Sequence, residues 1–328
     1  MRETSAPAPP AQPGERLTGP VWEHAAATPG RVRFARPTAA GWEPVTCARF
    51  RDDVLTVARG LAAAGVTPGA RVGLLSHTRY EWTVVDYAIL ACGAVTVPIY
   101  PTDAPEQVAW ILADADATGC VVETAQRARQ VRAAGVAERR WLRTLERGLP
   151  RLDGTAVDPA EITRRVRATR TDDLASIVYT SGTSGTPKGC EITHGNVLAA
   201  LAGAAAVLAP LFERPGTGLL LSLPLAHVLP RLVQFGGIRA DATLAYGRDL
   251  RALPRDLLSF RPDVLLAVPR MLEKLREAAR GEAASHGRAG AAVFARAEAV
   301  AADYSRALET AAGPGPGLRV QRWLFDRL

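Results

Sequence analysis

Apolar positions follow two different periods along the N-terminal part of the chain. Between Phe50 and Ala64 they recur with helical spacing, and Gly65 follows where a C-terminal cap is expected. A Pro-Gly turn then leads into a short apolar run at Val72–Leu75, which predicts a strand. The cycle continues with a helix, a strand, a helix and a strand, predicted over Tyr80–Cys92, Ala94–Ile99, Ala104–Ala115 and Gly119–Val122. Strands that alternate with helices indicate an α/β fold with a mostly parallel sheet.

A second α/β series begins at about residue 173. Its strands are predicted over Leu174–Tyr179, Leu219–Leu223, Ala242–Tyr246 and Val264–Val268, with helical patterns between them. Residues 135–172 show no clear period and are interpreted as a peripheral connection. After Met271 the pattern predicts almost continuous helix, broken between Gly281 and Gly290.

The N-terminal tail and the composition indicate where the folded domain begins and which partners are excluded. Residues 1–19 are rich in Pro, Ala and Gly, which predicts a disordered tail before a domain over residues 20–328. The tail lacks the apolar core of a signal peptide, and the longest apolar stretch, residues 198–212, is too short to cross a bilayer of about 30 Å. We therefore expect a cytoplasmic protein with no integral membrane segment, although peripheral membrane contact stays open. The net charge of +7 is spread over nearly every segment, which argues against a nucleic-acid partner.

The four cysteines give no sign of a metal site. Cys47, Cys92, Cys120 and Cys190 form no CxxC pair, so we expect reduced thiols that are buried or half-buried.

The strongest chemical signal is the sequence YTSGTSGTPKG at residues 179–189, which follows an apolar strand. Glycines let backbone N–H groups approach phosphate oxygens, hydroxyls add donors, and one lysine adds a mobile positive charge. The candidate phosphate-binding residues are Thr180, Ser181, Gly182, Thr183, Ser184, Gly185, Thr186 and Lys188. Counted from Gly182, this is no Walker A loop, because Pro187 and Gly189 stand where that motif requires Gly and Ser or Thr. A flexible linker is the plain alternative, but linkers do not normally follow a buried strand.

This loop resembles the signature loop of the adenylate-forming superfamily, which includes acyl-CoA synthetases, luciferases and peptide-synthetase adenylation domains. Three further segments are similar to long-chain fatty acyl-CoA synthetases: Val97–Thr102 with Glu106–Val108, Leu223–Arg231, and Val268–Leu275. The resemblance covers roughly residues 20–328. It implies the large N-terminal domain of that superfamily, with two α/β subdomains and without the C-terminal swinging domain.

The resemblance also assigns roles to residues. Lys188 and the loop hydroxyls would hold the β- and γ-phosphates of ATP, and Thr180 would lie near a magnesium ion. His227 would line the acyl and adenylate pocket as a wall residue rather than as a base, whereas the residues alone favour a core histidine. His194 and Asn196 are expected to be structural, with Thr193 capping the next helix. Arg270 could face the site or lie on the surface.

The family reaction joins a fatty acid to CoA through an acyl-adenylate, with ATP and Mg²⁺. The family motifs Tyr-Gly-x-Thr-Glu and Thr-Gly-Asp, which hold adenosine, do not occur in this chain, and neither does the mobile domain with its lysine. We therefore expect a truncated or split ligase that is inactive alone, possessing the triphosphate loop and part of the acyl site. Two alternatives stay open. One is a nucleotide-binding or regulatory half that pairs with a separate chain, and the other is an enzyme remodelled around different residues.

Overall fold

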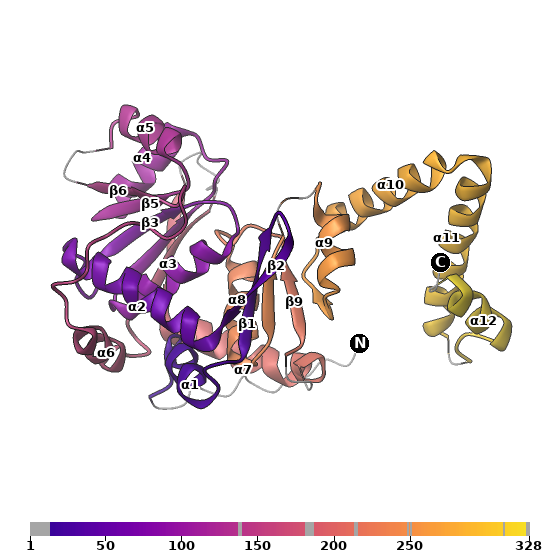
Figure 1. Cartoon of the computed structure of the whole chain (residues 1–328), viewed down its shortest axis with the longest axis horizontal. Helices are drawn as coiled ribbons and strands as arrows, with labels where there is room; N and C mark the ends of the chain where they lie inside the picture. The colour runs from indigo at the N-terminus through magenta and orange to yellow at the C-terminus, as the bar shows by residue number, and fades with distance from the viewer. Residues whose placement is uncertain are drawn as a thin grey trace. The chain divides into compact units, whose positions relative to one another are not determined.

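The computed structural model describes residues 14–136, 140–180, 187–212, 216–247, 249, 251–310 and 312–325. The chain divides into two compact units, Met1–Leu266 and Ala267–Leu328. Both sheets lie in the first unit, and the second unit is helical. Figure 1 shows the elements of each unit.

The larger sheet has six strands in the order β6-β5-β3-β4-β7-β8. All neighbours are parallel except β7 and β8, which form an antiparallel hairpin. The strands are β3 (Arg71–Leu75), β4 (Val95–Ile99), β5 (Gly119–Val122), β6 (Trp141–Thr144), β7 (Leu174–Thr180) and β8 (Lys188–Thr193). The central strands are apolar runs without alternation because helices cover both faces of the sheet.

Two groups of helices cover this sheet. In Figure 1, α4 (Pro105–Asp114) and α5 (Ala125–Ala133) lie on one face. The other face carries α2 (Cys47–Ala63), α3 (Tyr80–Ala91) and α6 (Pro159–Ala168). Each face has its own cluster of buried apolar side chains, the larger one around α2 and α3.

The second sheet joins strands from both ends of the unit, in the order β11-β9-β10-β1-β2. The strands are β1 (Val32–Thr38), β2 (Gly41–Thr46), β9 (Gly218–Leu221), β10 (Thr243–Tyr246) and β11 (Val264–Leu265). Its helices are α1 (Gly19–Ala27), α7 (His194–Leu208), α8 (Val228–Arg239) and α9 (Leu253–Phe260), with a 3₁₀ turn at Ala209–Phe212. Only β2 runs antiparallel to its neighbour.

Helix α3 is buried along all of its 12 residues and connects the two sheets. It packs against β3 and β4 of the larger sheet. Its Thr83 hydroxyl lies 2.5 Å from the hydroxyl of Tyr246 on β10 and 2.6 Å from Oε1 of Gln234 on α8. A helix in this position must be apolar all round, except where a partner satisfies each polar group.

The second unit contains α10 (Pro269–Ser285), α11 (Gly287–Leu308) and α12 (Pro316–Phe325). Helix α11 contacts both of the others. The predicted helix break falls at His286, between α10 and α11.

Most of the predicted helices and strands are present with ends shifted by a few residues. The prediction of a peripheral connection over residues 135–172 missed two elements, the edge strand β6 and helix α6. Their strand is short and their helix rich in arginine, so neither shows a long apolar period. The predicted strand to Val268 ends at Leu265. The tail prediction also extended too far, because Leu17 is 3% exposed and α1 begins at Gly19; residues 1–13 lie outside the described part.

The cysteine prediction holds for three of the four positions. Cys47, Cys92 and Cys120 are buried free thiols, whereas Cys190 is exposed on the edge strand β8. Burial raises the pKa of Cys92 and of Cys120 to about 12. These two thiols are therefore unreactive at neutral pH.

Close packing between β3 and α4 generates a test of the core. A Cβ at Gly73 would stand 2.5 Å from Cδ2 of Leu112 on α4 and 2.8 Å from Sγ of Cys120. Overpacking of this kind costs about 1–3 kcal/mol, so Gly73→Ala should lower the free energy of unfolding in urea. Gly281→Ala is the control, because no atom lies within 4 Å of the added Cβ in α10. Hydrogen exchange should show that this change stabilises α10 by about 0.5–1 kcal/mol. Equal stabilisation by both substitutions would contradict the packing described for β3.

Candidate functional site

The hairpin of β7 and β8 carries the two ends of the predicted phosphate loop. Thr180 pairs with Lys188, and Tyr179 pairs with Gly189. Opposed residues of an antiparallel pair project from the same face, so Thr180 and Lys188 share one face of the hairpin. Both residues are exposed. The predicted loop extended to Gly189, but the chain is already in β8 at Lys188; residues Ser181–Thr186 lie outside the described part.

Tyr179 anchors the end of β7 to helix α4. Its hydroxyl donates to Oδ2 of Asp114 at 2.6 Å, and its ring meets that of Trp110 edge to face at 5.8 Å. Burial, followed by the nearby Asp114 carboxylate, raises the pKa of Tyr179, so the hydroxyl keeps its proton at neutral pH. Gly189 leaves room for this ring, because a Cβ there would stand 3.1 Å from it.

His227 lies immediately before α8 and caps its first turn. Its Nδ1 accepts the backbone N–H of Leu229 at 3.2 Å. In a neutral imidazole this leaves the proton on Nε2, which can donate a hydrogen bond. The preceding Leu225 and Ala226 are buried, which fixes the turn, while His227 itself is exposed.

A hollow of about 830 Å³ lies at the carboxyl ends of β4 and β7. Its lining residues come from both strands, from α4 and from the start of α8: Pro98, Tyr100, Asp103, Gln107, Trp110, Ile111, Val178, Tyr179, Thr180, Pro187, His227 and Val228. Two of the predicted site residues, Thr180 and His227, therefore line one hollow. Lys188 is not among the lining residues but stands opposite Thr180 in the hairpin. In open parallel sheets, ligands commonly bind at this edge.

The hollow has one acidic lining residue among those described, Asp103. Burial raises its pKa, and the backbone N–H bond near Tyr100 and the charge of Arg127 oppose that rise. The wall around Trp110, Ile111 and Val178 is apolar. This wall suits the apolar part of a ligand, and Lys188, which pairs with Thr180 in the hairpin, is the cation that could meet an anionic part.

A buried ion pair with its hydrogen-bond partners connects α8, α3 and β7. Arg231 donates from Nε and Nη2 to the two carboxylate oxygens of Asp86, at 2.9 and 2.6 Å. Its Nη1 donates to the hydroxyl of Ser176 at 2.6 Å, and that hydroxyl donates to the carbonyl of Thr96 at 2.8 Å. The side chains of Asp86 and Arg231 are 0% and 6% exposed. The segment Leu223–Arg231 thus ends with a polar anchor, Arg231, for which the sequence analysis predicted no separate role.

The residues after the loop are structural, as predicted. Thr193 and Asn196 form a reciprocal capping box at the start of α7, with bonds of 3.1 and 3.0 Å. His194 is buried, and its Nδ1 has no hydrogen-bond partner in the part of the chain described. Burial lowers the pKa of His194 to about 4; the Asp173 carboxylate opposes this shift and the Arg231 charge adds to it. Arg270 lies exposed in the first turn of α10, in the second unit.

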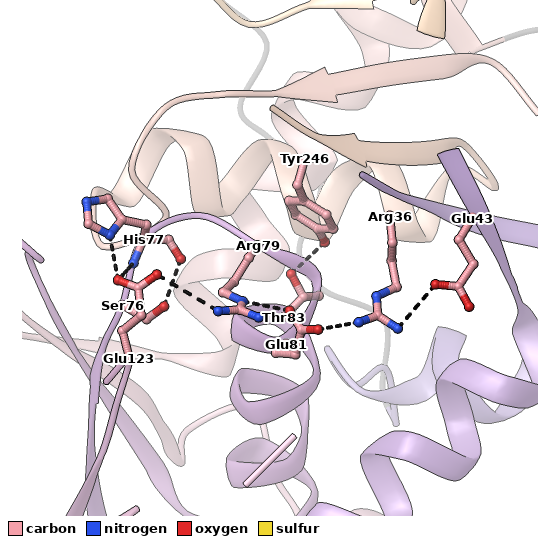
Figure 2. Close-up of polar contacts among 9 residues, drawn as sticks. All are labelled: Arg36, Glu43, Ser76, His77, Arg79, Glu81, Thr83, Glu123 and Tyr246. Atoms are coloured by element: carbon pink, nitrogen blue, oxygen red, sulfur yellow. Dashed lines mark hydrogen bonds and ion pairs between the residues drawn. The ribbon is translucent and has the colours of Figure 1, made fainter. Parts of the chain in front are cut away.

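A second polar cluster connects β1 to the carboxyl ends of β3 and β5. Figure 2 shows Arg36 and Arg79 on either side of Glu81, and His77 against Glu123. Arg36 contacts Glu81 at 2.5 Å, Arg79 contacts it at 2.7 Å, and Nδ1 of His77 lies 2.5 Å from Glu123. Burial would raise the pKa of Glu81, but hydrogen bonding and charge from Arg79, with the charge of Arg36, hold it below its usual range. No local pattern predicts a partner for His77, because Glu123 is 46 residues away.

This cluster borders a smaller hollow of about 460 Å³. Its two arginines already face the carboxylates of Glu81 and Glu123, and Asp249 adds a third acid to the lining. The described lining therefore holds three carboxylates against two arginines and offers no excess positive charge to an anion. We interpret the cluster as a junction between the sheets rather than as an anion site.

Comparison with known proteins agrees with the geometry. A model of the family described as "AMP-binding enzyme" matches residues 21–325. Over 337 aligned positions that include the whole chain, the sequence is 40% identical to the long-chain-fatty-acid–CoA ligase FadD15 of Mycobacterium tuberculosis. The chain spans 56% of the length of that relative.

Solved structures show the same fold. The N-terminal domain of FACL13 from Mycobacterium tuberculosis matches with a TM-score of 0.64 and 24% identity, over 80% of this chain and 65% of that one. VinN matches with a TM-score of 0.66 and 18% identity, over 81% of this chain and 64% of that one. Within the described residues, no helix is both long and apolar enough to span a membrane.

The buried His194 predicts a specific dependence of stability on pH. Its pKa is about 4 in the folded state and about 6.5 in an unfolded chain, so the unfolded state binds the extra proton. This contribution to stability is complete above pH 6.5 and should decrease by about 3 kcal/mol as the pH falls to 4. His194→Gln should remove that part of the pH dependence in urea titrations. An unchanged slope between pH 6.5 and 4 would show that another group is responsible.

Proposed function

Because the chain belongs to the AMP-binding enzyme family, we propose that it is the ATP-binding part of a fatty acid–CoA ligase that works through an acyl-adenylate. The 830-Å³ hollow is the substrate site of this proposal. The observation that carries it is the meeting of Thr180, at the start of the phosphate loop, with His227 in that one hollow. The name of the relative FadD15 supports a long-chain fatty acid as the substrate.

The β- and γ-phosphates of ATP bind at the β7–β8 hairpin. Lys188 supplies the positive charge, and Thr180 with the residues Ser181–Thr186 supplies hydroxyl and backbone donors. The pairing of Thr180 with Lys188 supports this assignment, because it brings a hydroxyl and an ammonium to the same face. Hydrogen bonds to charged groups contribute about 1.5–3 kcal/mol each.

The acyl group binds on the side of His227. The apolar wall of Trp110, Ile111 and Val178 suits an alkyl chain. The Nδ1 of His227 is occupied by the backbone N–H of Leu229, so its free group is the Nε2–H donor. A donor can orient a carboxylate or adenylate oxygen but cannot remove a proton, so His227 acts as a pocket wall rather than as a base.

A magnesium ion fits this site if it arrives with ATP. Magnesium in nucleotide sites keeps several waters and binds through phosphates and only one or two protein oxygens. No group of three or more His, Cys, Asp and Glu side chains suited to a metal occurs within the described residues. The Thr180 hydroxyl is the protein oxygen assigned to the ion, which would neutralise charge on the phosphates when bound.

Complete turnover requires more than the hollow. In the proposed reaction a carboxylate attacks the α-phosphate, and the CoA thiol then displaces AMP. Catalysis of this kind depends on positioning and on neutralising charge. The residues described here supply donors for the terminal phosphates and an acyl wall, while the relative FadD15 is nearly twice as long. Turnover therefore belongs to a longer polypeptide or to this chain with a partner, in the cytoplasm, where ATP and CoA are available.

The test of this function is the contribution of Lys188 to phosphate binding. Lys188→Ala should weaken pyrophosphate binding by about 1.5–3 kcal/mol, roughly tenfold or more, because one charge-assisted contact is lost. Calorimetry with the purified chain gives the dissociation constant, and circular dichroism checks that the fold is unchanged.

Lys274→Ala is the matched control, since Lys274 is the other lysine of the chain and lies in α10 of the second unit. It should leave the dissociation constant nearly unchanged. Equal losses from the two substitutions would count against a phosphate site at the hairpin.

A further inference from the structure

We propose that Arg231 is a positioning residue that fixes the two walls of the substrate hollow relative to each other. It lies four residues after His227, one turn further along α8. Its partner Ser176 lies four residues before Thr180 on β7. The Arg231 guanidinium thus joins α8, which begins at the wall of His227, to β7, which ends at the wall of Thr180. The proposal rests on the proposed function only in assigning acyl group and phosphates to these walls.

The geometry of the contact explains why arginine is required. Two nitrogens of the guanidinium engage both oxygens of Asp86, and the third reaches Ser176 at 2.6 Å. The planar fork meets all three acceptors at once, whereas a lysine ammonium is a point charge on a flexible stem. Arg231 is 5% exposed and Ser176 1%, so water cannot replace these bonds.

The network also fixes β7 within its sheet. The Ser176 hydroxyl donates a hydrogen bond to the backbone carbonyl of Thr96 on β4. The Thr96 hydroxyl in turn donates to Oδ1 of Asp86 at 2.8 Å. Four residues from α3, α8, β4 and β7 therefore form a closed set of bonds. Losing the Ser176 hydroxyl would release α8 from β7 while leaving the Arg231–Asp86 ion pair in place.

The test measures the distance between α8 and the β7–β8 hairpin, the elements that carry the two walls, in the full chain and without ligand. Spin labels are placed on the native Cys190, which is exposed on β8, and on Ala240→Cys, which is exposed at the end of α8; the other three cysteines are buried. Pulsed electron paramagnetic resonance then gives the distribution of distances between the two spin labels. Ser176→Ala and Arg231→Lys should each broaden or shift this distribution.

The matched control is Tyr80→Phe, which also removes a buried hydrogen bond. The Tyr80 hydroxyl donates to Asp53 at 2.8 Å and joins α3 to α2, touching neither wall. This variant should lower the melting temperature and leave the distances unchanged. Distributions for Ser176→Ala that match those of Tyr80→Phe would overturn the proposal, and this variant decides the outcome if Arg231→Lys fails to fold.

Calorimetry with pyrophosphate on the same samples separates this proposal from the proposed function. Broadened distances in Ser176→Ala, in a parent chain that binds no pyrophosphate, would support the positioning role and contradict the function. Tight pyrophosphate binding with unchanged distances would support the function and contradict the positioning role.

Discussion

The bidentate pair of Asp86 and Arg231 is the constraint on which the arrangement of this unit depends. Asp86 lies in a helix that is buried on every side, where an unpaired carboxylate could not keep its charge. Removing one member of such a pair costs about 3–5 kcal/mol, mainly because the remaining charge stays buried. The pair therefore specifies where α8 lies against α3 more than it adds net stability. Through Arg231, the pair also contacts Ser176 on β7 and lies one turn from His227 on α8.

As a result, the unit has two parts, a buried base that holds the elements in place and an exposed edge that carries the candidate site residues. The base consists of α3, its polar partners on both sheets, and the glycine-lined contact between β3 and α4. The edge consists of the β7–β8 hairpin and the start of α8, where Thr180, Lys188 and His227 are exposed. Exposed hydrogen-bond donors held by buried contacts suit a ligand that carries negative charge on several atoms.

Much of the frame could be predicted from the sequence, because strands β3, β4, β5 and β7 are continuous apolar runs between clear helical patterns. Strand β8 could not, since its residues KGCEIT are mostly exposed and owe their conformation to pairing with β7. The Arg231–Asp86 contact spans 145 residues and leaves no local signal. His227 entered the candidate site through the family resemblance rather than through its spacing. The joining of β1 to β10, more than 200 residues apart, likewise depends on tertiary packing.

We propose that these residues hold the phosphates of ATP but do not complete the reaction on their own. The most direct measurement is pyrophosphate release by the purified chain with ATP, Mg²⁺, CoA and a panel of fatty acids. We expect no release above the background of the Lys188→Ala variant, because in the proposed site the hairpin holds the terminal phosphates but does not align the α-phosphate with the carboxylate. Losing that alignment can forfeit about 7–11 kcal/mol of barrier reduction. Robust release that depends on Lys188 would instead show that the chain already contains a complete active site.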